Sequence, residues 1–374
     1  MRCHLRVGRR RRGARVESVA VSLAERLAAR TLELIDVPSE SRGEDAIATL
    51  VLGALRHGGV EARDMGDTCV LAGVTERRDR PLVLLAGHLD TVPAQDNRPG
   101  RREGDAVHGL GAADMKGAIA VMVELALSGV AERANVDLGF VFFGREELPV
   151  VHSALSPLLE REPGLRSADA AIVMEPTANA IHAGCLGNVN ATWTFPGTSG
   201  HSARPWLADN AIHRAAAGID ALAQVPTEPH DFGGLRFTQV VSVTRIEGGI
   251  ADNVIPDRAT AHVNLRYAPG TSPEDAERLL RGWCEPYGAI EVTGNAPSAP
   301  VATDNELVQR LIAAGDLAVE PKQAWTPVAE LAAAGVDAVN FGPGDPRYAH
   351  TRDEQVAIAA LVASHETLER FACG

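Results

Sequence analysis

Hydrophobic and polar residues follow two alternating patterns along the first half of the chain. Helical periodicity predicts amphipathic helices over residues 19–37 and 44–59, and an apolar helix is expected to follow Asp114 and end at Gly129. Short apolar runs predict buried strands over residues 69–74, 82–88, 138–144 and 170–175. Strands that alternate with helices are typical of a mostly parallel sheet covered by helices on both sides, so the expected fold class is α/β.

The pattern changes near residue 187, where strict alternation of apolar and polar positions begins. Residues 188–294 read in order as strand, helix, two strands, helix and strand, which is the order of a split, ferredoxin-like α+β unit. We therefore expect a domain formed by residues 21–186 and 299–374, with a second domain of residues 187–298 inserted into it. The basic residues 1–20 are expected to form a disordered arm.

Residues that can bind metal lie where several apolar runs give way to loops. The five candidates are His88, Asp114, Glu147, Glu175 and His350. Because functional residues in open α/β sheets gather outside the carboxyl ends of the strands, we expect these distant residues to converge. Two imidazoles and three carboxylates form a suitable ligand set for a pair of divalent cations, and zinc is the favoured metal.

Each of these candidates also has a simpler explanation. Asp114 precedes a helix and would serve as an N-cap, Glu175 is an acid at a strand end, and His350 lies in a loop where surface histidines are common. His88 alone is explained equally well by hydrogen bonds within a local turn. The metal site is therefore indicated by the combination and not by any single residue.

Three further residues are candidates for catalysis. Asp90 lies two positions after His88, where a carboxylate would fix the tautomer of a metal-binding imidazole. Glu146 and Glu147 are adjacent acids after an apolar run, so one can bind metal while the other acts as a general base, although such pairs are also common on surfaces. His201, in the loop GTSGHSARPW, could donate a hydrogen bond to a developing oxyanion.

Composition and charge argue against a nucleic-acid-binding protein and against a membrane protein. A formal charge of −13 argues against a nucleic-acid partner, and no apolar run approaches the ~18 residues of a membrane span. Five widely spaced cysteines without a CxxC pair favour a reducing cytoplasm. Only two of the 36 basic residues are lysine, Lys116 and Lys322, which we interpret as a bias in base composition.

The order of several short motifs gives a more specific result. With GHLDTVP, AADMKG, REE, EPT, GHSARPW and AHTRDE, residues 25–370 resemble the zinc-dependent amidohydrolase and exopeptidase family that includes succinyl-diaminopimelate desuccinylase, acetylornithine deacetylase and glutamate carboxypeptidase. PSESRGE, GGIADNVIPD and AVNFGPGDP are most similar to the actinobacterial desuccinylases of that family.

The resemblance implies two zinc ions, with cobalt or manganese as alternatives at one site. One ion would be bound by His88, Asp114 and Glu175. The other would be bound by His350, Asp114 and Glu147. Asp114 would then bridge the two ions, which are roughly 3.5–4 Å apart in such sites.

The resemblance also implies roles for residues that do not bind metal. Asp90 would orient His88, and Glu146 would carry a proton from the attacking water to the leaving amine. His201 would come from the partner subunit of a homodimer built through the inserted domain. The residues expected to contact substrate are Asn253, Arg266 and Thr326.

The implied reaction is hydrolysis of N-succinyl-LL-2,6-diaminopimelate, a step of lysine and diaminopimelate synthesis. An N-acetyl-amino-acid deacylase, a carboxypeptidase-like peptidase and an acyl-amino-acid-binding protein are the alternatives. The chain departs from its relatives at three places: Pro327 replaces a usual Asp, Ala118 replaces a frequent Gly, and residues 185–187 lack an Arg common in proteobacterial desuccinylases. These departures concern the acyl group and leave every metal ligand in place.

Overall fold

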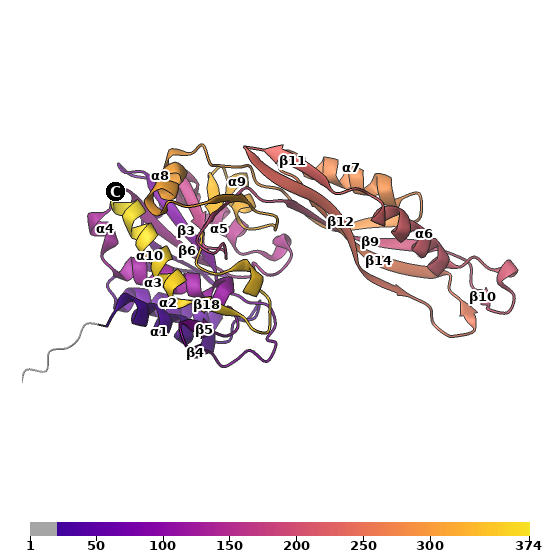
Figure 1. The fold of residues 1–374 in the computed structure, drawn as a ribbon, viewed down its shortest axis with the longest axis horizontal. Helices are drawn as coiled ribbons and strands as arrows, with labels where there is room; N and C mark the ends of the chain where they lie inside the picture. Colours follow the sequence, from indigo (N-terminus) through magenta and orange to yellow (C-terminus); the bar gives the residue numbers. More distant parts are fainter. Residues whose placement is uncertain (1–20) are drawn as a thin grey trace, which may run out of the picture.

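The fold consists of a helix-covered body and a long arm that projects from it (Figure 1). This computed structural model describes residues 21–374, so the basic arm expected at residues 1–20 lies outside the described residues. Within residues 21–374, no helix has both the length and the apolar character of a membrane span.

The body is built on an eight-stranded sheet. In spatial order its strands are β1 (Ala62–Gly66), β2 (Cys69–Gly73), β6 (Asp137–Phe143), β3 (Leu82–His88), β7 (Ala170–Val173), β17 (Ala338–Asn340), β8 (Ile181–Ala183) and β16 (Val319–Pro321). Strand β3 runs parallel to both β6 and β7, and β7 runs parallel to β17. The α/β class with a mostly parallel sheet is confirmed, although β1, β2 and the β17–β8 pair run antiparallel.

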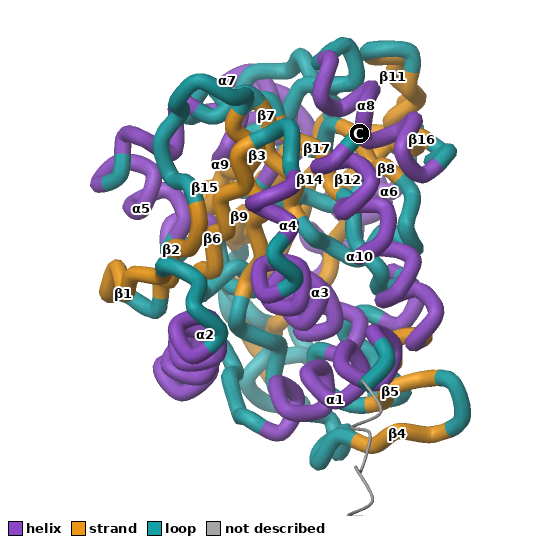
Figure 2. The backbone as a smooth tube through the Cα atoms, turned by 90° about the vertical axis from the view of Figure 1, so that its left-hand side faces the viewer, coloured by secondary structure: helices purple, strands orange, loops and turns teal. Residues whose placement is uncertain are grey.

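Helices cover both faces of this sheet, as the apolar strands require (Figure 2). One face carries α1 (Leu23–Asp36), α2 (Asp45–His57), α3 (Gly117–Leu127), α4 (Val130–Arg133), α8 (Glu306–Gly315) and α10 (Ile358–Cys373). The other face carries α5 (Leu155–Arg161) and α9 (Val328–Ala333). Successive residues of β3 serve the two cores in turn: Val83 and Leu85 pack on the first face, Leu84 and Ala86 on the second.

The arm is the inserted unit, and its sheet is antiparallel throughout. Its main elements are β9 (Gly187–Pro196), α6 (Ala211–Ala223), β11 (Glu228–Phe232), β12 (Leu235–Gly248), β14 (Arg258–Tyr267), α7 (Pro273–Cys284) and β15 (Ala289–Ala296). The spatial order β12-β14-β9-β15 is that of a ferredoxin-like fold, and β11 is an additional strand at the β12 edge. Trp193 and Phe195 of β9 lie in the core of this unit, fully buried.

The chain passes between body and arm through two adjacent segments. Cys185, where it leaves the body, pairs with Ala299, where it returns, through backbone hydrogen bonds in both directions. The remaining strands are short: β4 (Arg101–Glu103), β5 (Ala106–His108), β10 (Gly200–His201), β13 (Val254–Ile255) and β18 (Gln355–Ala357). The short helical turns are η1 (Ala112–Lys116), η2 (Val150–His152), η3 (Pro163–Ser167), η4 (Pro205–Leu207) and η5 (Pro346–Tyr348).

Candidate metal centre

Three neighbouring strands deliver most of the candidate ligands to one edge of the sheet. His88 is the last residue of β3, Glu146 and Glu147 follow β6, and Glu175 follows β7. Because β6, β3 and β7 are adjacent and parallel, their carboxyl ends meet at the same edge. The structure therefore brings together side chains that are up to 87 positions apart in the sequence.

Asp114 lies at the centre of this cluster. Its Oδ1 is 3.1 Å from His88 Nε2, and its Oδ2 is 3.4 Å from His350 Nε2. His350 Nε2 is also 3.0 Å from Glu147 Oε1, and His88 Nε2 is 3.8 Å from Glu175 Oε1. Two ligands of one tetrahedral zinc ion, each ~2.1 Å from it, are about 3.4 Å apart, so these separations suit shared metal coordination.

The alternative role of Asp114, a simple N-cap, is not what the structure contains. Helix α3 begins after Lys116, and Asp114 lies in the preceding turn η1 with non-helical backbone angles (φ −126°, ψ 92°). Its carboxylate contacts the two imidazoles instead of the first amides of α3. Asp114 thus has one oxygen directed to each half of the cluster.

Burial of several acids makes the cluster electrostatically unfavourable by itself. Burial raises the pKa of Glu175 to about 7, and the neighbouring Asp114 carboxylate adds to the shift. Burial and the Glu175 carboxylate likewise raise the pKa of Glu146 well above its usual range. Glu175 Oε1 is also buried without a hydrogen-bond partner. Divalent cations would satisfy that oxygen and offset the carboxylates, so the residues present fit a metal pair.

Among residues 21–374, two sets of three donor residues are close enough together to hold an ion. They are His88, Asp114 and Glu147, and His88, Glu146 and Glu175. The first set joins Glu147 to His88, two residues that the resemblance assigns to different ions, and neither set includes His350. The second set includes Glu146, which places this acid directly against the ligand cluster.

Asp90 positions three residues of the cluster, His88, Glu146 and Glu147, through hydrogen bonds. Its backbone oxygen is 3.0 Å from His88 Nδ1, closer than its carboxylate Oδ1 at 3.5 Å. The carboxylate accepts hydrogen bonds from the backbone N–H groups of Glu146 (3.0 Å) and Glu147 (3.1 Å) and from the Ser41 hydroxyl (2.7 Å). Asp90 therefore joins the end of β3 to the turn that carries both glutamates.

A second buried acid, which the sequence analysis did not single out, holds the Asp114 turn. The Glu354 carboxylate accepts hydrogen bonds from the backbone N–H groups of Gly111 (2.9 Å), Ala113 (3.0 Å) and Asp114 (3.0 Å). Glu354 lies four positions after His350 in the AHTRDE motif. Its position in the same motif as His350 is the sequence feature that could have identified Glu354 as a candidate.

The cluster opens into a cavity of about 340 Å³ between body and arm. Arg266 and Asn188 line it from the arm, and Lys322 and Trp325 line it from the body. Arg266 thus lies where a substrate-binding residue is expected. Thr326 does not line this cavity; its hydroxyl is buried and has no hydrogen-bond partner among the described residues.

His201 and Asn253 lie far from this cavity within one chain. His201 is in β10, at the distal end of the arm (Figure 1). It is exposed, and its neighbour Ser202 donates a backbone hydrogen bond to the Asn253 carbonyl (3.0 Å). The structure therefore places these two candidates next to each other but away from the ligand cluster.

Comparison with known proteins gives consistent matches over most of the chain. Residues 84–373 match the model of peptidase family M20/M25/M40. The chain is 41% identical to the putative succinyl-diaminopimelate desuccinylase DapE of Mycobacterium tuberculosis, over 92% of this chain and 97% of the relative. It is 35% identical to the succinyl-diaminopimelate desuccinylase of Corynebacterium glutamicum, over 91% and 94% of the two chains.

A solved structure shows the same fold at lower sequence identity. The M20 family metallo-carboxypeptidase Sso-CP2 of Sulfolobus solfataricus superimposes with a TM-score of 0.76 at 19% identity. The alignment covers 93% of this chain and 98% of that one. The two chains therefore share a fold over most of their length.

Proposed function

The chain belongs to peptidase family M20/M25/M40, and we propose that it hydrolyses the amide bond of N-succinyl-LL-2,6-diaminopimelate to succinate and LL-2,6-diaminopimelate. The observation that carries this proposal is the ligand cluster at the carboxyl edge of the sheet, in a chain similar to two desuccinylases over nine-tenths of its length. The reaction would serve lysine and diaminopimelate synthesis.

We propose zinc as the metal at both positions, with cobalt or manganese as alternatives at one. His88, Asp114 and Glu175 would hold one ion, and His350, Asp114 and Glu147 the other. When bound, such a pair lowers the pKa of a water molecule and polarises the scissile carbonyl. The neutral imidazoles and ionised carboxylates of this set are the forms that bind zinc.

Glu146 is the residue we assign to proton transfer. Its side chain lies against His88 and Glu175, and its backbone N–H is fixed by Asp90. A carboxylate held there takes a proton from the attacking water and delivers it to the leaving amine. Burial favours the protonated form of this group, which the second of these transfers requires.

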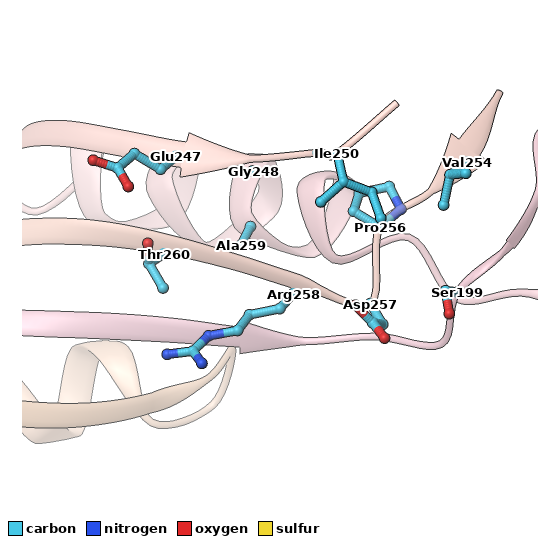
Figure 3. Close-up of a pocket in the computed structure, with 11 residues that line it drawn as sticks. Ser199, Glu247, Gly248, Ile250, Val254, Pro256, Asp257, Arg258, Ala259 and Thr260 are labelled. Atoms are coloured by element: carbon cyan, nitrogen blue, oxygen red, sulfur yellow. The ribbon is translucent and has the colours of Figure 1, made fainter. Parts of the chain in front are cut away.

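A second copy of the chain would complete the site by supplying His201 to its oxyanion. The distal end of the arm has the properties of an interface: Trp206, Leu207 and Ile250 are 75%, 67% and 88% exposed. Ile250 also lines a cavity of about 440 Å³, together with Val254, Pro256 and other residues (Figure 3). Large exposed apolar side chains grouped in this way mark association surfaces.

The edge of the arm sheet supports the same proposal. Strand β11 pairs with β12 only over residues 235–239, so residues 240–248 of β12 pair with β14 on one side alone. An unpaired strand edge can add the strand of a second copy. The homodimer would then use both the open β12 edge and the exposed distal residues.

Complementation between inactive variants tests the shared site. We expect Glu146→Ala and His201→Ala each to be inactive as homodimers. If His201 acts in the partner's site, mixed subunits would carry one intact site in each heterodimer, and activity would recover to about a quarter of the wild-type value after statistical exchange. No recovery from a mixture that light scattering shows to contain dimers would contradict the shared site.

The substrate itself is tested by paired assays. We expect zinc-loaded protein to hydrolyse N-succinyl-LL-2,6-diaminopimelate with a higher kcat/KM than the N-acetyl compound or a dipeptide. A preference for either of these would favour the deacylase or the peptidase. Binding without any turnover, unchanged in Glu146→Gln, would identify an acyl-amino-acid-binding protein. We further propose a cytoplasmic location, since the four described cysteines are free and three of them are buried.

A further inference from the structure

Lysine is rare in this chain, and both lysines lie beside the metal centre. Only Lys116 and Lys322 occur among 36 basic residues. They are 1% and 7% exposed, whereas lysine is almost never buried without a partner. In a chain that otherwise uses arginine, two buried lysines mark places where a compact ammonium group is required.

The two lysines differ in what they contact. Lys116 Nζ donates a hydrogen bond to the Val37 carbonyl (2.9 Å), which fixes the Asp114 turn to the end of α1. Lys322 Nζ is 3.8 Å from Glu175 Oε2 and donates no hydrogen bond to any residue in the range 21–374. Lys116 therefore has a structural partner, but Lys322 directs unused donors into the cavity.

Arg266 lines the same cavity from the opposite domain. Its Nε donates to Asn264 (3.0 Å), and its terminal nitrogens donate to no described residue. Lys322 comes from the body, and its neighbour Gln323 exchanges hydrogen bonds with the backbone of Thr238 in the arm (2.9 and 3.2 Å). The two cations thus lie on either side of the junction between body and arm, with free donors.

The balance of charge in this cavity determines what it can bind. Its lining contains four acidic side chains, Asp114, Glu146, Glu147 and Glu175, and two basic ones, Arg266 and Lys322. Two divalent metal ions would offset the four carboxylates. Both cations would then remain without a counter-charge, in a site where metal charge already disfavours a further cation. A ligand with two negative groups, one on each side of the scissile amide, resolves this imbalance.

We propose that Lys322 binds the terminal carboxylate of the acyl group and so selects succinyl over acetyl substrates. The inference rests on the proposed function and deepens it. An N-succinyl amino acid has a carboxylate on both sides of the amide, whereas its N-acetyl counterpart lacks the one on the acyl side. Lys322 is buried and Arg266 is partly exposed, so the deeper cation suits the shorter succinyl arm. The longer diaminopimelate arm then extends past Arg266 toward the opening.

The test compares Lys322→Met, which keeps length and removes charge, with Lys322→Arg and with Arg133→Met. Arg133 is exposed and paired with Glu369, so it is a matched loss of one charge away from the cavity. Each protein is assayed on N-succinyl- and N-acetyl-LL-2,6-diaminopimelate. Zinc content and succinate affinity are measured by metal analysis and calorimetry.

We expect Lys322→Met to lower kcat/KM for the succinyl substrate by roughly 10–100-fold, mainly through KM, because a hydrogen bond to a charged group contributes about that factor. The loss of kcat/KM on the acetyl substrate should be about tenfold smaller than on the succinyl substrate, so that the ratio of the two falls, while succinate affinity decreases in parallel with the succinyl substrate. Lys322→Arg keeps the positive charge, but its larger guanidinium should fit the buried position poorly. Its kcat/KM for the succinyl substrate should therefore lie between those of Lys322→Met and the wild type. Arg133→Met should behave as wild type.

Two outcomes would overturn the inference. Equal losses on both substrates together with lost zinc would mean that Lys322 only supports Glu175, and unchanged succinate affinity in Lys322→Met would remove it from recognition. Wild-type protein that hydrolyses neither substrate would refute the proposed function separately. In that case the succinate titrations of wild type and Lys322→Met would still decide the role of Lys322.

Discussion

Replacing Glu354 by Gln tests whether the Asp114 turn is held in place from outside the metal cluster. The Glu354 carboxylate is 2% exposed and accepts three backbone hydrogen bonds, one of them from Asp114 itself. Gln has the same shape, so no cavity is created. Its amide offers one acceptor oxygen in place of two, and its NH2 group must face one N–H of the turn.

The structure allows the cost of this change to be worked out. With the Gln oxygen toward Ala113 and Asp114, its NH2 group faces the Gly111 N–H, which loses its partner 2.9 Å away. An unpaired buried donor costs about 1–3 kcal/mol, and the two remaining bonds lose their assistance from a full charge, for a total on the order of 2–4 kcal/mol. Metal ions bound through Asp114 should be held roughly 10–100-fold more weakly, as when outer partners of metal ligands are removed.

The assay is competition with a chelator of known zinc affinity, combined with thermal unfolding. Asp353→Asn is the matched control, because Asp353 is the adjacent acid and is exposed. We expect Asp353→Asn to bind zinc as wild type does. Glu354→Gln with wild-type zinc affinity, whether or not its unfolding temperature falls, would refute the idea that Glu354 positions Asp114.

Three other predictions follow from the same structure. Glu146→Ala should retain both metal ions by elemental analysis yet lower kcat by roughly 10²–10⁴-fold, and a fully active variant would exclude Glu146 from proton transfer. Chelation should lower the unfolding temperature. Zinc at 100 times its Kd should restore about 2.7 kcal/mol of unfolding free energy per site, or roughly 3–4 °C per site, and an unfolding transition that does not depend on zinc would contradict the metal centre. Burial and the Lys322 charge lower the pKa of His182 to about 4, so its contribution to stability is full above the unfolded value near 6.5 and is lost as pH falls toward 4. Denaturant titrations should show that the unfolding free energy of His182→Gln falls by up to about 3 kcal/mol less than that of the wild type over that pH range, and an identical pH dependence of the two proteins would contradict the assignment.

Regular patterns made most of the architecture predictable from the sequence. The alternation from residue 188 onward corresponds to β9, in which every second residue is buried, and the strand and helix order of the arm follows directly. The ligand positions followed from a rule of topology, since adjacent parallel strands must end at one edge. The antiparallel pairing of β17 with β8 carried no such signal, because these three-residue strands are too short for a period to be read.

Glu354 escaped prediction for a physical reason. It acts through backbone amides, and a backbone acceptor leaves no complementary side chain in the sequence to search for. His201 and Asn253 were named from the resemblance alone. They lie together at the distal end of the arm, so their assigned roles stay predictions that depend on a second copy of the chain.

The two lysines are a different case, because the sequence did contain information about them: lysine is rare in this chain, and both lysines lie near the ligand cluster. The scarcity of lysine was interpreted as a bias in base composition, and that bias is a reason to examine the two that remain. Where arginine can replace lysine freely on an exposed surface, a lysine persists only where the larger guanidinium does not fit or its geometry is wrong. Burial of both Lys116 and Lys322 agrees with this reasoning. In a chain with strong compositional bias, the rare residue of an interchangeable pair is therefore the one whose position is most constrained by structure.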